Sequence, residues 1–385
     1  MNVPKLRFKE FNDEWQNYKV EEILKISNGI NKEKEFFGSG TPIINYMDVN
    51  KNELISHNIV KGLVIANSKE LETFNVKKGD ILFTRTSETS DEIGLSSSVI
   101  ENIDKCIFSG FILKGTQTKQ FIHPYFGGYY FRNPKMRKEI IKHSSITTRA
   151  LTSGSLLSQM SISIPTIIEQ EKIGKTLSLL DKKVELQAKK IEDLKLFKKG
   201  LIYNEKRNNN SWNEYKISNI MNITRGIVIP KTEISECINN EFKYPVYSSQ
   251  TSNNGILGYD NKYDFNGKFL TWTTDGANAG KVFYREGKFR CTNVCGILYN
   301  KDNRYVSELT AELLNIETPK YVSYVGNPKL MNNVMSNIII KLPDPSRDYF
   351  FSSILKIINK KLTIEEKKFD KLFELKKGFM QNMFV

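Results

Sequence analysis

Residues 15–23 read Trp-Gln-Asn-Tyr-Lys-Val-Glu-Glu-Ile, and residues 212–220 read Trp-Asn-Glu-Tyr-Lys-Ile-Ser-Asn-Ile. Further matches follow in the same order along the chain: Gly29-Ile30 with Gly226-Ile227, Asn133-Pro134-Lys135-Met136 with Asn327-Pro328-Lys329-Leu330, Ile162-Ser163-Ile164-Pro165 with Ile340-Lys341-Leu342-Pro343, and Leu194 to Leu201 with Leu372 to Phe379. Matches in register indicate two copies of one structural unit. The offset falls from 197 residues to 178 along the chain, so the second copy is the shorter one.

Each copy ends in a long segment whose apolar residues are spaced three and four apart. The first stripe is Ile173, Leu177, Leu180, Val184, Ile191, Leu194 and Phe197, and the second is Phe351, Leu355, Ile358, Leu362, Phe369, Leu372 and Leu375. Gln187 and Glu365 interrupt the two stripes at matching positions. This spacing predicts two helices of about 35 residues, each roughly 50 Å long.

A narrow apolar stripe on a long helix needs a partner. A homodimeric coiled coil is one interpretation. Two equal stripes in one chain favour pairing of the two helices with each other. They must run antiparallel if the globular parts are to lie at opposite ends, and the molecule then has pseudo-two-fold symmetry.

The globular parts contain short β-branched and aromatic runs separated by Gly-Asp and Asn turns. Strand-like runs occur at 76–82, 98–113, 269–273, 281–284 and 295–299, and short helices are expected around 125–142 and 304–316. The predicted architecture is α+β, with a strongly twisted or barrel-like sheet in each globular part. Its predicted divisions are a first module (1–165), a central helix (166–205), a second module (206–343) and a C-terminal helix (344–385).

Lys and Arg outnumber Asp and Glu by 57 to 43, which gives a formal net charge of +14. Such an excess favours polyanionic partners, namely nucleic acid, a membrane surface or acidic proteins. No stretch approaches the roughly 20 apolar residues of a membrane span, and Met1–Lys5 does not begin a signal peptide. The cysteines Cys106, Cys237, Cys291 and Cys295 form no paired motif, so we expect reduced thiols in a cytoplasmic protein without a zinc site.

Two basic modules held apart by rigid helices would act as a ruler on DNA. A spacer of about 50 Å would place them roughly one to one and a half helical turns apart on double-stranded DNA. The predicted target is therefore split by an unread gap, and it is not a palindrome because the modules differ in sequence.

Candidate DNA contacts lie on polar, basic, Gly-containing loops. In the first module they are Thr84, Arg85, Thr86, Ser87, Arg132, Lys135, Arg137, Lys138, Thr147, Thr148 and Arg149; in the second they are Ser248, Ser249, Gln250, Thr251, Asn253, Asn254, Thr273, Thr274, Asn278, Arg285 and Arg290. Arg pairs with guanine edges and Asn or Gln with adenine edges, while Lys, Ser and Thr mostly hold phosphates. The plainer alternative for each residue is an ordinary turn or a solvated charge.

Motifs for catalysis are missing from the sequence. There is no Gly-rich phosphate loop ending in Gly-Lys-Ser/Thr and no His-Glu-x-x-His. Asn133-Pro134 and Asn327-Pro328 share only the first two residues of an Asn-Pro-Pro-Tyr methylation motif and indicate turns or helix starts. We therefore expect no catalytic residue, no metal site and no cofactor bound by this chain.

The chain resembles the specificity subunit of type I restriction-modification systems over nearly its whole length. The resemblance lies in the order module, helix, module, helix, and in these local phrases: Trp15 through Ile23, Lys78-Gly79-Asp80-Ile81-Leu82-Phe83, Ile164-Pro165 with Glu169-Gln170-Glu171-Lys172-Ile173, Pro245 through Thr251, Asn254-Gly255-Ile256, and Thr274-Asp275-Gly276 with Ala279-Gly280. The second copy departs from this pattern, because Pro343-Asp344-Pro345 replaces the Pro165-x-x-x-Glu169-Gln170 arrangement.

The resemblance implies two target recognition domains, each reading half of a split site, and an antiparallel coiled coil between them. It implies partners, namely two modification subunits that methylate adenine with S-adenosylmethionine and restriction subunits that use ATP and Mg²⁺ for translocation and cleavage. Three rival interpretations remain: a single-chain methyltransferase or nuclease, a structural or regulatory coiled-coil protein, and an orphan specificity subunit that varies a partner's target.

Overall fold

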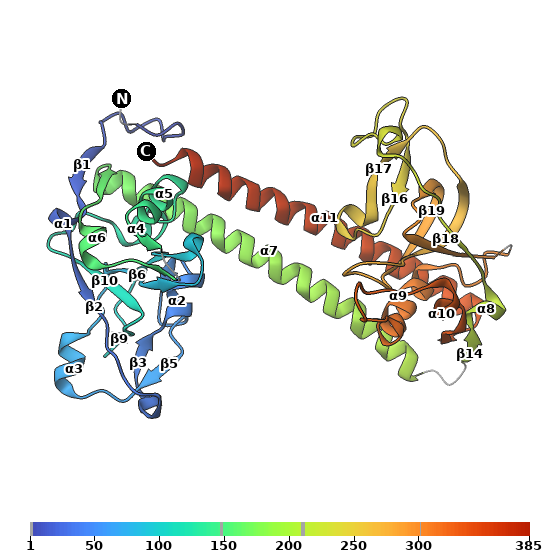
Figure 1. The fold of residues 1–385 in the computed structure, drawn as a ribbon, viewed down its shortest axis with the longest axis horizontal. Helices are drawn as coiled ribbons and strands as arrows, with labels where there is room; N and C mark the ends of the chain where they lie inside the picture. Colours follow the sequence, from blue (N-terminus) through green and yellow to red (C-terminus); the bar gives the residue numbers. More distant parts are fainter. Residues whose placement is uncertain (1–2, 147–148, 209–211, 301) are drawn as a thin grey trace. The chain divides into compact units, whose positions relative to one another are not determined.

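The computed structural model describes residues 3–146, 149–208, 212–300 and 302–385. The chain divides into two compact units (Figure 1). Unit 1 comprises Met1–Ala188 and Lys367–Val385, and unit 2 comprises Lys189–Glu366. The described residues form no helix that is long and apolar enough to cross a membrane.

The two long helices are α7 (Ile167–Asn208) and α11 (Pro345–Asn382), and each belongs partly to both units. Asp344 begins α11 as its cap, because its Oδ1 accepts hydrogen bonds from two first-turn amides, those of Ser346 and Arg347. Pro345 then occupies the first helical position, where no amide hydrogen is needed.

The two helices pair in opposite directions within unit 2. Lys190 lies 3.1 Å from Glu365, and Lys198 lies 3.1 Å from Asn359. Glu205, further along α7, pairs at 2.9 Å with Arg347, which comes earlier in α11. In unit 1, Asp181 of α7 pairs with Lys376 of α11. The predicted in-chain antiparallel pairing is therefore confirmed within unit 2, and the same two helices also contact each other in unit 1.

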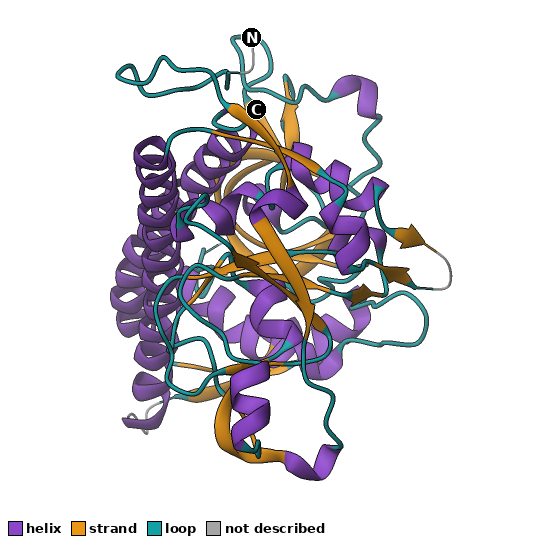
Figure 2. Ribbon diagram, turned by 90° about the vertical axis from the view of Figure 1, so that its left-hand side faces the viewer, coloured by secondary structure: helices purple, strands orange, loops and turns teal. Residues whose placement is uncertain are grey.

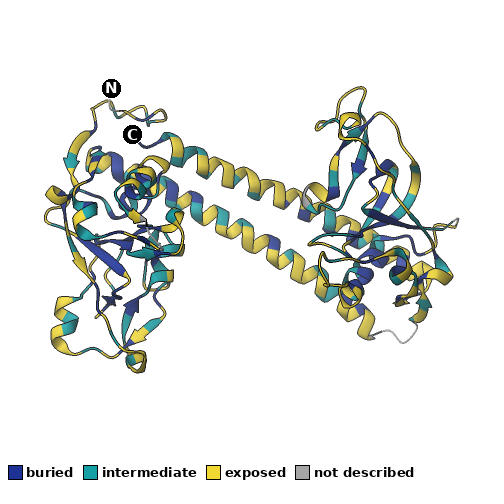
Figure 3. Cartoon of the chain, in the orientation of Figure 1, coloured by how far each residue is buried: buried dark blue, intermediate teal, exposed yellow. Residues whose placement is uncertain are grey.

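Most residues of the two predicted stripes are buried or half-buried. Figure 3 colours the chain by burial and shows buried and half-buried positions along both long helices. Ile173, Leu177, Leu180, Ile191, Phe351, Leu355, Ile358 and Leu362 are buried, and Val184, Leu194, Phe369 and Leu372 are half-buried. The prediction is wrong at Phe197 and Leu375, which are 61% and 46% exposed. Lys198 and Lys376 turn inward in their place, because each meets hydrogen-bonding partners there.

The first module is a mixed α/β structure (Figure 2). Its strands are β1 (Gln16–Lys19), β2 (Leu24–Asn28), β3 (Phe37–Ile44), β4 (Leu54–Ile55), β5 (Gly62–Val64), β6 (Ile81–Thr84), β7 (Thr86–Ser87), β8 (Ser96–Val99), β9 (Ile107–Phe108), β10 (Ile112–Gln117), β11 (Ser145–Ile146), β12 (Ala150–Leu151) and β13 (Ser161–Ile164). Its helices are α1 (Val20–Ile23), α2 (Tyr46–Lys51), α3 (Ser68–Thr73), α4 (Pro124–Tyr130), α5 (Pro134–Lys142) and α6 (Gly154–Ser158). The central sheet has the order β2-β10-β6-β8-β4.

The short helices expected around 125–142 are α4 and α5. Asn133 separates them, and its side chain accepts hydrogen bonds from the amides of Lys135 and Met136. Pro134 follows at the first position of α5. The interpretation of Asn133-Pro134 as a helix start is confirmed.

The second module contains β14 (Asn213–Lys216), β15 (Asn222–Arg225), β16 (Tyr244–Tyr247), β17 (Ile256–Asp260), β18 (Phe265–Thr273), β19 (Val282–Cys291), β20 (Cys295–Tyr299) and β21 (Ile339–Leu342). Its helices are α8 (Ile217–Ile220), α9 (Glu308–Glu317) and α10 (Asn332–Asn337). Six strands form one sheet in the order β15-β20-β18-β19-β16-β17. The strands expected at 269–273, 281–284 and 295–299 are confirmed.

Strand pairing repeats between the modules. The antiparallel pair β1–β13 corresponds to β14–β21, and β2–β10 corresponds to β15–β20. Even the parallel pair β3–β9 has its counterpart in β16–β19. The internal repeat seen in the sequence is therefore a repeat of fold, and the predicted α+β architecture of two modules with two long helices is confirmed.

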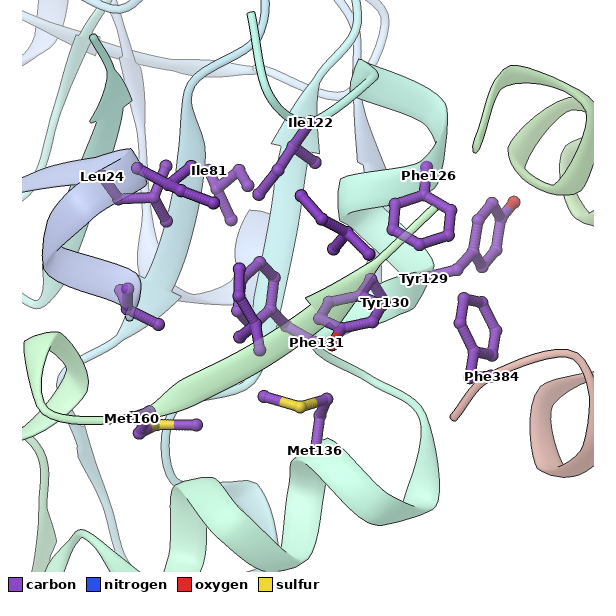
Figure 4. Packing of buried hydrophobic residues seen from close by; sticks show 14 of the residues in the cluster. Leu24, Ile81, Ile122, Phe126, Tyr129, Tyr130, Phe131, Met136, Met160 and Phe384 are labelled. Carbon is purple, nitrogen blue, oxygen red and sulfur yellow. The ribbon is translucent and has the colours of Figure 1, made fainter. Parts of the chain in front are cut away.

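Aromatic side chains fill the core of unit 1 (Figure 4). Phe126, Tyr129 and Tyr130 of α4 are fully buried, and Phe384, which follows α11, packs against Phe126 with 5.6 Å between the ring centroids. In unit 2, Trp272 packs on Gly296, where a Cβ would lie 2.1 Å from the indole ring. Only glycine fits beneath this tryptophan.

Candidate nucleic-acid interface

The segment after β6 crosses one end of the first module. The Arg85 amide donates to the Phe111 carbonyl at 2.9 Å, and the Arg85 carbonyl accepts from Thr152 at 3.0 Å. The Thr84 carbonyl accepts from Gly94 at 3.1 Å. Arg85 is thus held between two neighbouring backbone segments.

The segment after β18 has the same bonding pattern in the second module. The Thr274 amide donates to the Val294 carbonyl at 3.0 Å, and the Thr274 carbonyl accepts from Leu330 at 2.9 Å. The Thr273 carbonyl accepts from Gly280 at 2.9 Å. The candidate segments beginning at Thr84 and Thr273 therefore occupy equivalent places in the two modules.

The other candidate loop of the second module, 248–254, lies at this same end. The Thr292 hydroxyl donates to the Ser248 hydroxyl at 3.0 Å, which joins the loop to the turn between β19 and β20. The next turn residue, Asn293, accepts a hydrogen bond from the Arg225 guanidinium, which also lies 3.5 Å from Asp275. We call these residues the second reading surface: Ser248 to Thr251, Asn253, Asn254, Arg225, Asn293 and Asp275 to Asn278.

Asn253 and Asn254 project from the tip of loop 248–254. Both have left-handed backbone conformations, with φ of 48° and 52°, and Gly255 follows at 78°. Asparagine tolerates this conformation better than other residues with side chains. Both amides are exposed, whereas Gln250 donates its side-chain amide to the Ile256 carbonyl and so helps to close the loop.

At the equivalent end of the first module, basic and apolar side chains are accessible. Phe111 and Leu151 are 63% and 40% exposed. Arg85 and Thr86 are half-buried, and the exposed Arg149 lies 3.5 Å from Glu88. We call Arg85, Thr86, Phe111, Arg149 and Leu151 the first reading surface. The predicted contacts Thr147 and Thr148 lie outside the described residues.

Two predicted contacts of the first module have intramolecular roles. Arg132 donates through Nη2 to the carbonyls of Asn50 and Asn52 at 3.0 and 2.9 Å, and so closes the C-terminal end of α2. Arg137 donates to the carbonyls of Asp91 and Ile93. These guanidinium groups hold loops together, so we do not propose them as DNA contacts.

Two predicted arginines of the second module are buried. Arg285, 3% exposed, lies between the rings of Tyr247 and Phe283, with its guanidinium carbon 3.7 and 4.4 Å from their centroids. Arg290, 7% exposed, bonds to Asp260 at 2.5 Å and Asp264 at 3.0 Å. Both support the sheet, and we do not propose them as DNA contacts.

Four candidate hydroxyl residues are also buried: Thr84, Ser87, Thr273 and Thr274. Thr84 donates to the Glu92 carbonyl at 3.1 Å, and Thr274 donates to Asp275 at 2.6 Å. These buried residues support the two reading surfaces from within the modules. Lys135 and Lys138 on α5 and Asn278 are exposed, while Ser248, Ser249 and Thr251 are half-buried.

Sequence reasoning missed Arg225, Asn293 and Phe111. Arg225 directly precedes Gly226, a residue of the internal repeat, which is the only sequence signal that marked its neighbourhood. Asn293 and Phe111 lie in the corresponding turns of the two modules, but their bonding partners come from distant segments.

Among the described residues, no group of three or more His, Cys, Asp or Glu side chains could hold a metal ion. Cys291 and Cys295 are buried where β19 ends and β20 begins. Burial raises the pKa of the Cys291 thiol well above its usual range. Such a thiol is neutral at physiological pH.

Comparison with known proteins agrees with this two-module plan. The family model of the type I restriction modification DNA specificity domain matches residues 12–196 and again residues 209–374. A putative type I specificity subunit of Mycoplasma pneumoniae is 35% identical over 197 residues, which are 49% of this chain and 76% of that protein. The specificity subunit of its type I restriction enzyme MpnII is 41% identical over 130 residues, 34% of this chain and 38% of that protein.

Other relatives are also matched over only part of their length. Two further putative specificity subunits of Mycoplasma pneumoniae, 46% and 45% identical, are matched over 65% and 35% of their own length and over 32% and 34% of this chain. The crystal structure of a type I restriction-modification S subunit from M. genitalium superimposes with a TM-score of 0.72 at 16% identity, covering 100% of this chain and 99% of that chain, which shows a shared fold. The chain therefore belongs to the type I restriction modification DNA specificity family, whose domain it carries twice.

Proposed function

We propose that this chain is a non-catalytic subunit that reads a split, asymmetric DNA site, with one half-site for each module. The observation that carries the proposal is the equivalence of the two reading surfaces. The same backbone bonding pattern holds Arg85 in one module and the buried Thr274 in the other, while the exposed side chains around these two positions differ. Equivalent placement with different chemistry suits two different half-sites.

The chemistry of each surface suggests what it reads. Arg85 and Arg149 suit bidentate contacts to guanine, and Phe111 suits apolar contact with a thymine methyl group. Asn253 and Asn254 suit adenine edges. Exposed lysines such as Lys135 suit phosphates, which position a protein on DNA without reading its sequence.

Partner subunits would supply the chemistry. We propose that two modification subunits dock on the long helices and methylate adenine with S-adenosylmethionine. Restriction subunits, using ATP and Mg²⁺, would join the same assembly. These cofactors would belong to the partners.

Exposed apolar side chains support docking on the helices. In unit 1, Leu179, Leu186 and Leu375 are 63%, 58% and 46% exposed. Their repeat-equivalent residues in unit 2 are Ile357, Ile364 and Phe197, which are 69%, 45% and 61% exposed. Matching apolar positions in each unit suit two copies of one partner.

The decisive test of whether this chain selects the DNA sequence to be methylated is a methylome. The chain is expressed with its neighbouring modification subunit in a methylation-free host, and the modification subunit alone serves as control. We expect a split, asymmetric adenine-methylation motif only when both are present. An assembled complex without any motif would contradict the proposal and favour a regulatory coiled-coil protein. Methylation by the purified chain alone would instead revive a catalytic role.

Docking is tested by co-purification of the modification subunit. The double substitution Leu179→Glu and Leu186→Glu should reduce the number of modification subunits that co-purify with each chain from two to one. The exposed neighbours Lys182 and Lys183 on the same helix provide a control, substituted by glutamate in the same way. Equal recovery of two copies with the leucine variants would place the partner elsewhere.

A further inference from the structure

The Lys-Lys-Gly motif occurs at the same place in both copies, and the reading surfaces do not use it. Its first lysine is Lys198 in α7 and Lys376 in α11. Both lie on the inward face, where the stripe would otherwise continue with an apolar residue, and their side chains are only 19% and 21% exposed. A lysine turned inward on an apolar stripe requires polar partners.

In unit 1, Lys376 joins three parts of the structure. Its ammonium nitrogen lies 2.6 Å from Asp181 of α7 and 3.0 Å from Glu53, which precedes β4. Asp181 also accepts a 2.6 Å hydrogen bond from the Tyr129 hydroxyl of α4. Burial raises the pKa of Glu53, but Lys376 and Arg132 together hold that pKa below its usual value. Both long helices are thereby tied to the first module.

In unit 2, Lys198 makes the corresponding connections. Its ammonium nitrogen lies 2.9 Å from Glu312 of α9 and 3.1 Å from the Asn359 side chain of α11. Asn359 in turn donates to Glu308 of α9 at 2.9 Å. Both long helices are thereby tied to the second module.

The two sets of contacts are related by the internal repeat. Lys198 and Lys376 are 178 residues apart, and so are their partners Asp181 and Asn359. The second lysines of the motif, Lys199 and Lys377, are exposed and make no hydrogen bond or ion pair in the described parts of the chain. Among the residues that the structure describes, only the first lysine of each motif therefore has a structural partner.

An apolar stripe by itself specifies register poorly. It repeats every seven residues, so two stripes also fit after a slide of one heptad, which is about 10.5 Å or roughly three base pairs of DNA. A lysine with partners on the other helix and on the module meets them in one register only. A single polar residue in such a seam is a known means of selecting one arrangement.

We propose that Lys198 and Lys376 are positioning residues that lock each module onto the paired helices in one register and thereby set the gap between the two half-sites. This inference rests on the proposed function. It assigns gap selection to these two polar contacts, and half-site selection to the reading surfaces.

The test uses the chain assembled with its modification subunit and a plasmid library. The library carries the two half-sites from the methylome, separated by the native gap or by one, two or three base pairs more or less, so that it includes the roughly three base pairs of a one-heptad slide. Methylation at each gap is measured by sequencing. We expect Lys376→Met and Lys198→Met each to reduce the preference for the native gap at least about tenfold, with the half-sites unchanged. Lys377→Met and Lys199→Met are the matched controls and should keep the native preference, as should Lys376→Arg.

The outcomes separate this inference from the proposed function. If the wild-type complex produces no split motif, the proposed function itself fails. If the wild-type motif appears and folded Lys376→Met and Lys198→Met keep the native preference, only the inference is overturned. Should Lys376→Met fail to assemble, Glu53→Gln together with Asp181→Asn removes both carboxylates without changing side-chain size. A native gap preference in that variant would overturn the proposal for unit 1, and a relaxed preference would support it.

Discussion

Replacing Arg290 by methionine should destabilise unit 2 without acting through DNA. The Arg290 guanidinium bonds to Asp260 at 2.5 Å, and the two side chains are only 8% and 2% exposed. It also contacts Asp264 and Glu233 at 3.0 and 3.5 Å, but these carboxylates are 31% and 46% exposed. Removal of Arg290 leaves the Asp260 carboxylate buried beside an apolar side chain.

The expected loss of stability is about 3 kcal/mol. Breaking a buried ion pair on one side typically costs about 3–5 kcal/mol, because one charge remains without compensation. The lower end applies here since the backbone amide of Lys262 still donates to Asp260 at 3.0 Å. The hydrated Asp264 and Glu233 add no more than about 1 kcal/mol each. At roughly 2 kcal/mol per molar urea, the unfolding midpoint of unit 2 should fall by about 1.5 M.

The three tryptophans allow each unit to be followed separately. Incorporation of 5-fluorotryptophan gives fluorine signals for Trp272 and Trp212, which lie in unit 2, and for Trp15, which lies in unit 1 and serves as an internal control. The Trp272 transition should shift and the Trp15 transition should not. The double variant Arg290→Met with Asp260→Asn should recover most of the loss, because the uncompensated charge is gone.

The pH dependence provides a further check. Burial raises the pKa of Asp260, but hydrogen bonds from the Lys262 amide and Arg290 together hold it below its usual value. A carboxylate with a lowered folded-state pKa contributes stability above its unfolded pKa of about 3.9, and loses it as pH falls through the folded value. The difference between wild type and Arg290→Met should therefore shrink at acidic pH. An unchanged Trp272 midpoint combined with weaker DNA binding would refute this reasoning and make Arg290 a DNA contact.

Four other outcomes are expected. Arg85→Ala should lower methylation about 10- to 100-fold by weakening recognition of the first half-site only, and the unfolding midpoint should not change. An equal loss of binding to DNA of unrelated sequence would indicate that Arg85 contacts a phosphate. Asp348 is 5% exposed, and burial raises its pKa to about 6, so ionisation of this carboxyl group destabilises the fold increasingly as pH rises from about 4 to 6. Asp348→Asn should therefore stabilise unit 2 by about 2 kcal/mol at pH 7.5 and give no gain in stability below about pH 4, as measured by urea unfolding. Seven-residue helical insertions after both Ala188 and Glu366 should lengthen the gap by about three base pairs and leave the half-sites intact, whereas an unchanged gap in the methylome would contradict the ruler. Exchange of residues 206–343 for the module of a relative should change only one half of the motif, and loss of both halves would count against modular reading.

The repeat and the long helices could be predicted because their signals are local. Trp15 and Trp212 begin matching phrases, and the heptad stripes identify the helices without knowledge of any distant contact. The stripes were correct through Leu194 and Leu372. The prediction of burial was wrong at the next position of each stripe, Phe197 and Leu375. Helical spacing alone cannot show that Lys198 and Lys376 have polar partners on the inward side of the helices.

The reading surfaces were only partly predictable. Polar composition identified the loop 248–254 and the segment beginning at Thr273, and the structure places both at one end of the second module. Composition could not separate Arg85 from Arg290. Arg85 directly follows β6 and Arg290 lies near the end of β19, but the carboxylates that neutralise Arg290 come from β17 and the turn after it, about 30 residues earlier in the chain.

The sequence by itself determined that the chain consists of two copies of one module, each followed by a helix, because repetition and periodicity are properties of neighbouring residues. Only the tertiary structure decided which basic side chains are accessible and which are neutralised within the protein. That difference depends on segments far apart in the chain, whose approach is determined by strand pairing and core packing. The two inward lysines illustrate the point: their repetition is visible in the sequence, but their role depends on carboxylates and amides that only the fold brings to them.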